Sequence, residues 1–207
     1  QVMNLADAAA RSINANVLLV RAGALYHDIG KIANPQCFTE NQTSGVRYHD
    51  GLTPKESAQE IIRHVSDGLW LADKHGLPDV IKDFIVSHHG TTSTGYFLTQ
   101  YLNNGGNPDD VADFMYDGIR PVSKEQVVLM ICDAVEAASR SLKDYSPQSI
   151  SDLVDRIVES KAAENQFDDS DVSLRELNSL KEVIKAYLQQ MYHSRVSYPK
   201  RKVKAGK

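Results

Sequence analysis

Histidine and aspartate residues occur between positions 27 and 133 in the order His-Asp, His, His-His and Asp. The residues are His27, Asp28, His64, His88, His89 and Asp133. Each of them alone has an ordinary structural explanation, such as a buried histidine that bonds to a nearby backbone group. Together, imidazole and carboxylate groups delivered by four helices would suit one or two borderline divalent ions such as iron, manganese or zinc.

Two residues just after the first His-Asp pair suggest what such a metal would act on. Gly30 is expected to let the chain turn away from the metal, and Lys31 to bring a point charge to an anion bound there. A phosphate fits a metal with a lysine beside it better than a carbonyl substrate does. The pattern therefore predicts phosphoester hydrolysis by a metal-activated water.

Other polar and aromatic residues have two explanations each. His49 could support the metal ligands or lie in a solvated turn. Tyr96 and Phe97 follow the His-His pair and could stack on a nucleobase, or pack beneath their own loop. Glu136 and Arg140 lie one and two helical turns beyond Asp133, so they could face the site or pair with each other.

Hydrophobic residues recur at helical spacing along nearly the whole chain, which predicts an all-α fold, a helical bundle with its metal site among the helices. The first helix is expected over residues 2–13. The stripe of the second helix is expected to run through Leu18, Ala22, Leu25 and Ile29, with the His-Asp pair in its last turn and Gly30 as its stop.

Helix starts are marked by capping residues. Thr53 and Glu56 form a capping box with Pro54 at the first helical position, and the run SLRE at 173–176 forms another. Ser123 and the pair Ser146-Pro147 mark two further starts. These signals predict long helices on both sides of the Asp133 segment.

The bulk composition excludes several classes of protein. The chain has 207 residues, a net charge of −4 and two cysteines, so neither a nucleic-acid polymer as partner nor a disulfide framework is indicated. The cysteine usage favours a reducing, cytoplasmic setting, and no stretch is apolar enough for a membrane span. We expect a single domain over 1–207, with a metal-binding core in 1–143, C-terminal helices in 144–199 and a disordered basic tail in 200–207.

Long stretches of the sequence resemble one branch of the HD superfamily of metal-dependent phosphohydrolases. The stretches are GALYHDIGKIANPQCFTENQ, LTPKESAQEIIRHVSDGLWLADKHGLP, FIVSHHGTTST, ICDAVEAASRSL and YHSRVSYP. They resemble the cytosolic domain of the bacterial seven-transmembrane HD phosphodiesterases over nearly the whole chain.

The resemblance implies hydrolysis of cyclic di-AMP to the linear dinucleotide pApA at a centre of two divalent metal ions, iron or manganese. All six histidines and aspartates named above would be metal ligands, with Asp28 bridging both ions. Asp28 and Lys31 would be the catalytic residues, and Lys31, Tyr96 and Arg120 would contact the substrate. The whole protein would be anchored in the membrane by an upstream segment, with this domain in the cytoplasm and homodimerisation left open.

The sequence departs from the family pattern in two places. The family has a further histidine ligand on the first helix, before the point where this chain begins, so we expect weaker binding of one metal here. The run FMYDGIRPVSKE is less proline-rich than in the family, with Met115 and Asp117 at changed positions near Arg120.

Two rival functions share most of these features. An HD enzyme for cyclic di-GMP usually has His-His-Glu followed by Gly-Tyr-Pro, whereas this chain has His88-His89-Gly90 and then Gly95-Tyr96-Phe97. Nucleotidases of the superfamily lack the ENQ loop. A non-catalytic sensor that binds a nucleotide is the other alternative, and the intact set of ligands does not favour it.

Overall fold

The computed structural model describes residues 1–42 and 47–193, and its regular secondary structure in these ranges is helical. The only β-type pairing among the described residues is an isolated bridge between Ser93 and Met115. The α-helices are α1 (Val2–Ser12), α2 (Val17–Tyr26), α3 (Pro54–Lys74), α4 (Asp79–Ser87), α5 (Gly95–Asn103), α6 (Lys124–Ser139), α7 (Pro147–Ala163) and α8 (Leu174–His193). Short 3₁₀-helices are η1 (Ile29–Ala33), η2 (Pro35–Cys37), η3 (Thr39–Asn41), η4 (Tyr48–Gly51) and η5 (Pro108–Phe114). The all-α prediction is confirmed.

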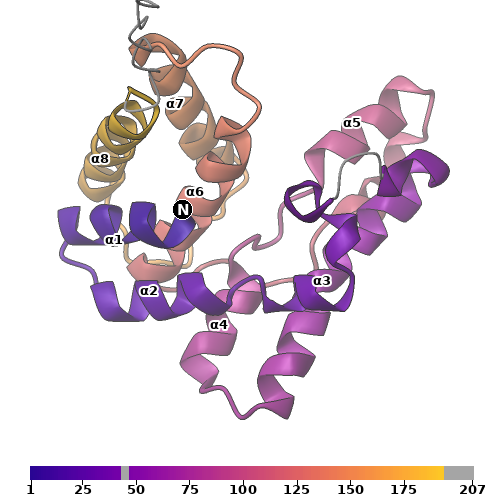
Figure 1. The fold of residues 1–207 in the computed structure, drawn as a ribbon, viewed down its shortest axis with the longest axis horizontal. Helices are drawn as coiled ribbons and strands as arrows, with labels where there is room; N and C mark the ends of the chain where they lie inside the picture. Colours follow the sequence, from indigo (N-terminus) through magenta and orange to yellow (C-terminus); the bar gives the residue numbers. More distant parts are fainter. Residues whose placement is uncertain (43–46, 194–207) are drawn as a thin grey trace, which may run out of the picture.

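The helices form two groups that meet at α2, α4 and α6 (Figure 1). On one side, α1 packs against α2, α6 and α8, and α7 packs against α6 and α8. On the other side, α3 contacts η1, α4, α5 and η5. No helix in the described ranges combines the length and the apolar character that crossing a bilayer requires.

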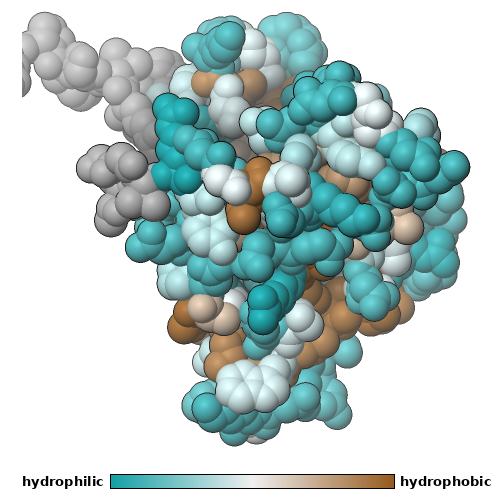
Figure 2. All heavy atoms as spheres, turned by 90° about the vertical axis from the view of Figure 1, so that its right-hand side faces the viewer, coloured by the Kyte–Doolittle hydropathy of each residue, from teal (hydrophilic) through white to brown (hydrophobic). Residues whose placement is uncertain are grey.

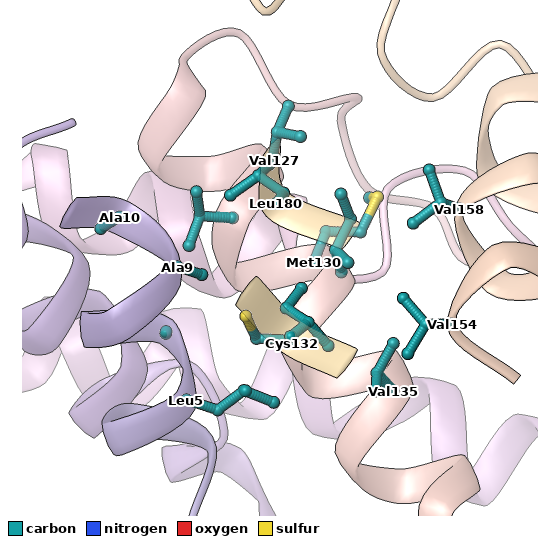
Figure 3. Close-up of a cluster of buried hydrophobic side chains, with 14 of the residues drawn as sticks. Leu5, Ala9, Ala10, Val127, Met130, Cys132, Val135, Val154, Val158 and Leu180 are labelled. Carbon is teal, nitrogen blue, oxygen red and sulfur yellow. The ribbon is translucent and has the colours of Figure 1, made fainter. Parts of the chain in front are cut away.

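An apolar cluster between α1, α6, α7 and α8 is the main hydrophobic core. Side chains such as Leu5, Cys132, Val135 and Val154 converge on one space between these helices (Figure 3). Leu180 on α8 is also fully buried there. The helices beyond residue 143 therefore share one core with the N-terminal helices.

The capping signals in the sequence are confirmed at the atomic level. The Thr53 hydroxyl accepts a hydrogen bond from the Glu56 backbone, and the Glu56 carboxylate accepts one from the Thr53 backbone. The Ser173 and Glu176 pair does the same at the start of α8. Ser123 accepts from the Gln126 backbone at the start of α6. Each cap satisfies backbone N–H groups that a helix leaves without an internal partner.

The expected buried stripe of the second helix is wrong. Leu18 and Leu25 are 79% and 63% exposed, whereas Val20, Gly23 and Ala24 are buried. A β-carbon added to Gly23 would stand only 2.5 Å from ring atoms of Phe84 on α4. Because α2 carries apolar residues all round, it packs through the face whose small residues allow the closest approach.

The side of the molecule that carries α3 and α5 is largely hydrophilic (Figure 2). Hydrophobic residues reach this surface mostly in its lower part, in the orientation of the figure. Trp70 on α3 is 60% exposed, and the Lys74 ammonium lies 4.7 Å from its ring centroid.

Candidate metal centre

The six predicted ligands come from the ends or middles of four helices and meet in the interior. His27 is the C-cap of α2 and Asp28 follows it, so the helix ends one turn earlier than expected and the chain continues into η1. The other four lie in the middle of α3, at the end of α4 and within α6. The six side chains form two groups, and within each group the potential ligand atoms lie within 4.8 Å of one another. One group is His64, His88 and His89, and the other is His27, Asp28 and Asp133. We call these the triple-histidine group and the Asp28 group.

Three of the histidines are oriented by the same backbone contact. The Nδ1 atoms of His27, His64 and His88 lie 3.0, 2.6 and 2.7 Å from the carbonyl oxygen three residues earlier. Since a carbonyl oxygen only accepts, each Nδ1 must carry the proton. The Nε2 atoms therefore point toward the centre, an arrangement typical of metal-bound histidines.

Asp28, a member of the Asp28 group, also faces the triple-histidine group. Its Oδ2 is 3.1 Å from His27 Nε2 and 2.8 Å from the Lys31 ammonium. Its Oδ1 lies 3.5 Å from His64 Nε2 and 3.7 Å from His88 Nε2. Each oxygen of this carboxylate thus faces a different pair of nitrogen atoms, which is the position that a bridging ligand requires.

Gly30 allows η1 to lie directly against α3. A β-carbon on this residue would stand 1.8 Å from the carbonyl oxygen of His64 and 2.5 Å from the Gly68 nitrogen. Glycine is therefore needed here because two backbones approach closely, whereas the sequence suggested a turn away from the metal. The contact fixes the distance between Asp28 and His64.

Burial and charge separate the histidines into one cation and several neutral imidazoles. Burial alone would lower the pKa of His27, but hydrogen bonds to Asp133 and Asp28 outweigh it and raise the pKa to about 10. Burial, followed by the charge on His27, lowers the pKa of His88 to about 3. Burial likewise lowers the pKa of His64 and His89. Burial alone would raise the pKa of Asp28 and Asp133, but His27 holds both pKa values below the usual one.

The centre between the two groups fits a divalent cation. Asp28 Oδ1 is buried and accepts no hydrogen bond. It faces His64 Nε2 and His88 Nε2, which are 3.1 Å apart and both unprotonated when Nδ1 carries the proton. Two imidazole lone pairs and an unpaired carboxylate oxygen that converge in a buried space repel one another unless a cation lies between them.

Lys31 lies at the edge of the Asp28 group. Its ammonium is 2.8 Å from both Asp28 Oδ2 and Glu40 Oε1. Burial alone would lower its pKa, but Asp28 and Glu40 outweigh burial and raise it, so the side chain is charged at neutral pH. Arg140 bonds to Glu136 and lies 3.8 Å from Glu40. The alternative in which Glu136 and Arg140 pair with each other is therefore confirmed, and Arg140 also lies near Glu40, the partner of Lys31.

Beside Lys31 a cavity of about 830 Å³ extends toward α5. Its lining includes Phe38, Glu40, His49, Tyr96 and Phe97. Tyr96 is 75% exposed and Phe97 is buried. The ring of Phe38 also contacts that of His64, with centroids 5.5 Å apart, so the cavity adjoins the triple-histidine group. His49 does not join either ligand group; its Nε2 lies 2.8 Å from the Cys37 carbonyl oxygen.

Arg120 lies apart from the ligands. Its guanidinium donates two hydrogen bonds to Asp169, at 2.8 and 3.1 Å, and a third to the Asn165 carbonyl oxygen. Its predicted contact with the substrate stays a prediction, since in this structure the side chain is engaged with the loop between α7 and α8.

The loop between α7 and α8 also makes hydrogen bonds to the residues that follow His89. The sequence did not predict this contact. Gln166 is buried, and its Oε1 accepts from the Thr91 backbone while its Nε2 donates to the Thr91 hydroxyl. Gly90, with φ +56°, leaves room for this amide. Lys161 on α7 bonds to Thr92 from the same side. No local pattern marks these residues, because their role depends on α7 folding back over the His-His loop.

Comparison with known proteins assigns the family. Residues 1–138 match the family model described as HD domain. The chain belongs to the HD domain family. It is 39% identical to the cyclic-di-AMP phosphodiesterase PgpH of Listeria monocytogenes over 199 residues. The matched region covers 96% of this chain and 27% of that protein. It is 37% identical to PgpH of Bacillus subtilis, over 96% of this chain and 28% of that protein.

A solved structure of an HD domain is similar over nearly its whole length. The HD domain of L. monocytogenes PgpH in complex with cyclic-di-AMP superposes with a TM-score of 0.87 at 38% identity, covering 92% of this chain and 89% of that one. The resemblance seen in the sequence is thereby confirmed. The chain spans about a quarter of the length of the curated relatives that it matches.

Proposed function

We propose that this HD domain is a metal-dependent phosphodiesterase that hydrolyses cyclic di-AMP to pApA. The observation that carries the proposal is the position of Asp28, whose two oxygens face the triple-histidine group and the Asp28 group at once. The relatives named as cyclic-di-AMP phosphodiesterases, and the similar domain solved with that dinucleotide, support the choice of substrate.

The six ligands would hold two divalent transition-metal ions, iron or manganese, with Asp28 shared between them. Bound there, such ions neutralise phosphate oxygens and supply a hydroxide nucleophile at neutral pH. His64 and His88 are held neutral by burial, so their Nε2 lone pairs are available as ligands. His27 must lose a proton before it can ligate, since its pKa is raised to about 10 without a metal.

Lys31 would bind a phosphate oxygen. Asp28 and Glu40 hold its ammonium at the edge of the ligand groups and keep it charged. A phosphate that takes the place of Glu40 as partner would receive a charge-assisted hydrogen bond. Tyr96 and Phe97, in the wall of the adjoining cavity, would then be placed to contact an adenine.

Because the chain spans only about a quarter of its curated relatives, we propose that it acts as the cytosolic catalytic part of a membrane-anchored signalling protein. Attachment would come from an upstream transmembrane segment, and a homodimer would be compatible with this arrangement.

The test is hydrolysis of cyclic di-AMP and of cyclic di-GMP with Mn²⁺ or Fe²⁺, followed by chromatography of the products. Both the 207-residue chain and a form extended at its N-terminus are assayed, because the family resemblance places a further histidine ligand before residue 1. We expect pApA from cyclic di-AMP, faster with the extended form. Faster cleavage of the guanine dinucleotide would contradict the substrate, and binding without any product would favour a sensor.

Replacement of Asp28 tests the site directly. Asp28→Ala removes the carboxylate that faces both groups, and the loss of several kcal/mol of charge stabilisation corresponds to a rate lower by about 1,000-fold or more. Metal content, measured by mass spectrometry, should fall in parallel. Asp152→Ala, on the exposed face of α7, is the matched control and should leave both unchanged.

A further inference from the structure

Lys161 brings a positive charge to the neighbourhood of the triple-histidine group. It lies on α7, and its ammonium donates a 3.3 Å hydrogen bond to the Thr92 hydroxyl. That hydroxyl in turn donates to the carbonyl oxygen of His89, at 2.8 Å. Two successive hydrogen bonds therefore connect this lysine with the backbone of a predicted metal ligand.

The surroundings of this ammonium differ from those of Lys31. Lys31 is within 2.8 Å of two carboxylates. Within residues 1–42 and 47–193, Lys161 has no carboxylate oxygen within 4.0 Å. It is half-buried, and burial lowers its pKa although Glu164 and Asp133 act in the opposite direction. A cation that is partly removed from water without a paired carboxylate is stabilised by any anion that reaches it.

The position of Lys161 is fixed by the contacts around it. The Gln166 amide binds Thr91 through both of its polar atoms, which ties the end of α7 to the loop after His89. Lys161 lies beyond residue 138, where the match to the HD family model ends. The C-terminal helices thus add a charge to a site whose predicted metal ligands all lie within the matched part.

We propose that Lys161 binds a phosphate of the dinucleotide, on the side of the centre where His89 and Thr92 lie. Lys31, beside Asp28, would serve the other side, so that a substrate with two phosphates meets a cation at each end. This inference depends on the proposed function, because it assigns a residue to the same substrate.

The experiment measures the affinity of the Mn²⁺-loaded protein for cyclic di-AMP as the Michaelis constant of its hydrolysis, with pApA quantified by chromatography at a series of substrate concentrations. Lys161→Met keeps the aliphatic stem and removes the charge. We expect its affinity for cyclic di-AMP to fall by about tenfold, as for loss of a charge-assisted hydrogen bond. Lys161→Arg should restore most of the affinity. The difference between wild type and Lys161→Met should shrink as the salt concentration rises.

Controls separate this role from a purely structural one. Lys74→Met, on α3 ten residues and about 15 Å of helix beyond His64, should have no effect. Circular dichroism and metal content after loading should match the wild type in all variants.

The outcomes also separate this inference from the proposed function. Wild-type hydrolysis of cyclic di-AMP, together with equal affinities of wild type and Lys161→Met, would overturn the role of Lys161 and leave the proposed function intact. A loss of affinity that Lys161→Arg does not restore would overturn it as well, since it would indicate packing in place of charge. Failure of the wild type to hydrolyse cyclic di-AMP when loaded with Mn²⁺ would overturn both.

Discussion

The two regions that share α6 are held together by opposite means. On one face of α6, Met130 and Val135 pack into the apolar cluster with α1, α7 and α8. On another face, Asp133 joins His27 and Asp28 at the end of α2. The first region gains free energy by removing apolar surface from water. In the second region, removing polar groups from water costs free energy, and only well-placed hydrogen-bond or ionic partners offset that cost.

The difference indicates that stability and chemistry are separable in this domain although they meet on one helix. Substitutions in the apolar cluster should change the free energy of unfolding without changing the metal ligands. Substitutions where the two regions touch should change both. Substitutions at the outer surface of the apolar side should change little of either.

The largest change in the free energy of unfolding is expected in the apolar cluster. Leu180→Ala removes a fully buried side chain of α8 and leaves a cavity, which should lower the free energy of unfolding by about 2–5 kcal/mol. Urea denaturation followed by circular dichroism measures this loss. The number of metal ions bound per folded molecule should not change.

A control lies on the same helix. Leu174 is 81% exposed, and Leu174→Ala should change the free energy of unfolding by no more than about 0.5 kcal/mol. If Leu180→Ala instead removed metal without destabilising the fold, the division between the two regions would be wrong.

The sequence predicted the parts of the fold that depend on local chemistry. The capping boxes at Thr53 and Ser173 are such parts, since a hydroxyl and a carboxylate three residues apart satisfy backbone groups of the same turn. The convergence of the six histidines and aspartates was also predictable, although from a family resemblance as much as from spacing. Each of these residues alone could have been structural, and only their number and order along the chain pointed to a common site.

The parts that the sequence did not predict depend on contacts between distant segments. The buried face of α2 was misassigned because Leu18 and Leu25 form as good a stripe as Gly23 and Ala24 until the ring of Phe84 is placed. The need for glycine at position 30 could likewise not be predicted, since the backbone that Gly30 contacts lies some 34 residues away on α3. Only the packing of helices decides such positions.

The second prediction concerns the contact between the two regions. Gln166→Leu keeps the volume of the side chain but leaves the Thr91 backbone N–H without its acceptor. An unsatisfied buried donor costs about 1–3 kcal/mol, so the free energy of unfolding should fall by that amount. The loop that carries His89 should also lose its support, and metal affinity should fall by up to about tenfold.

Chelator competition measures the affinity, and urea denaturation measures the stability. The control is Gln190→Leu, on the exposed side of α8, which should alter neither. An effect of Gln166→Leu on stability alone would mean that the loop keeps His89 in place without help from the C-terminal helices.

The smallest effect is expected at the outer surface of the apolar side, where Asp155 on α7 pairs with two lysines of α8. Its Oδ1 lies 2.9 Å from Lys181 and its Oδ2 lies 2.9 Å from Lys185. Hydrogen bonds and charge, from Lys181 above all, hold the pKa of Asp155 below its ordinary value of 3.8 in spite of partial burial. Asp155→Asn removes the charge and keeps the shape, and it should lower the free energy of unfolding at pH 7 by no more than about 1 kcal/mol.

The pH dependence of that small difference identifies its cause. A carboxyl whose pKa is lower in the folded than in the unfolded protein contributes stability above its unfolded pKa, and this contribution is lost as the pH falls through the folded pKa. The difference between wild type and Asp155→Asn should therefore be constant from pH 7 to about 5 and decline below the ordinary pKa of 3.8. Salt at 1 M should reduce it at pH 7, because the three side chains are partly exposed and screened. A difference that persisted unchanged at pH 3 would show that the pair acts through hydrogen bonds that the amide also makes, and that charge has no part in joining α7 to α8.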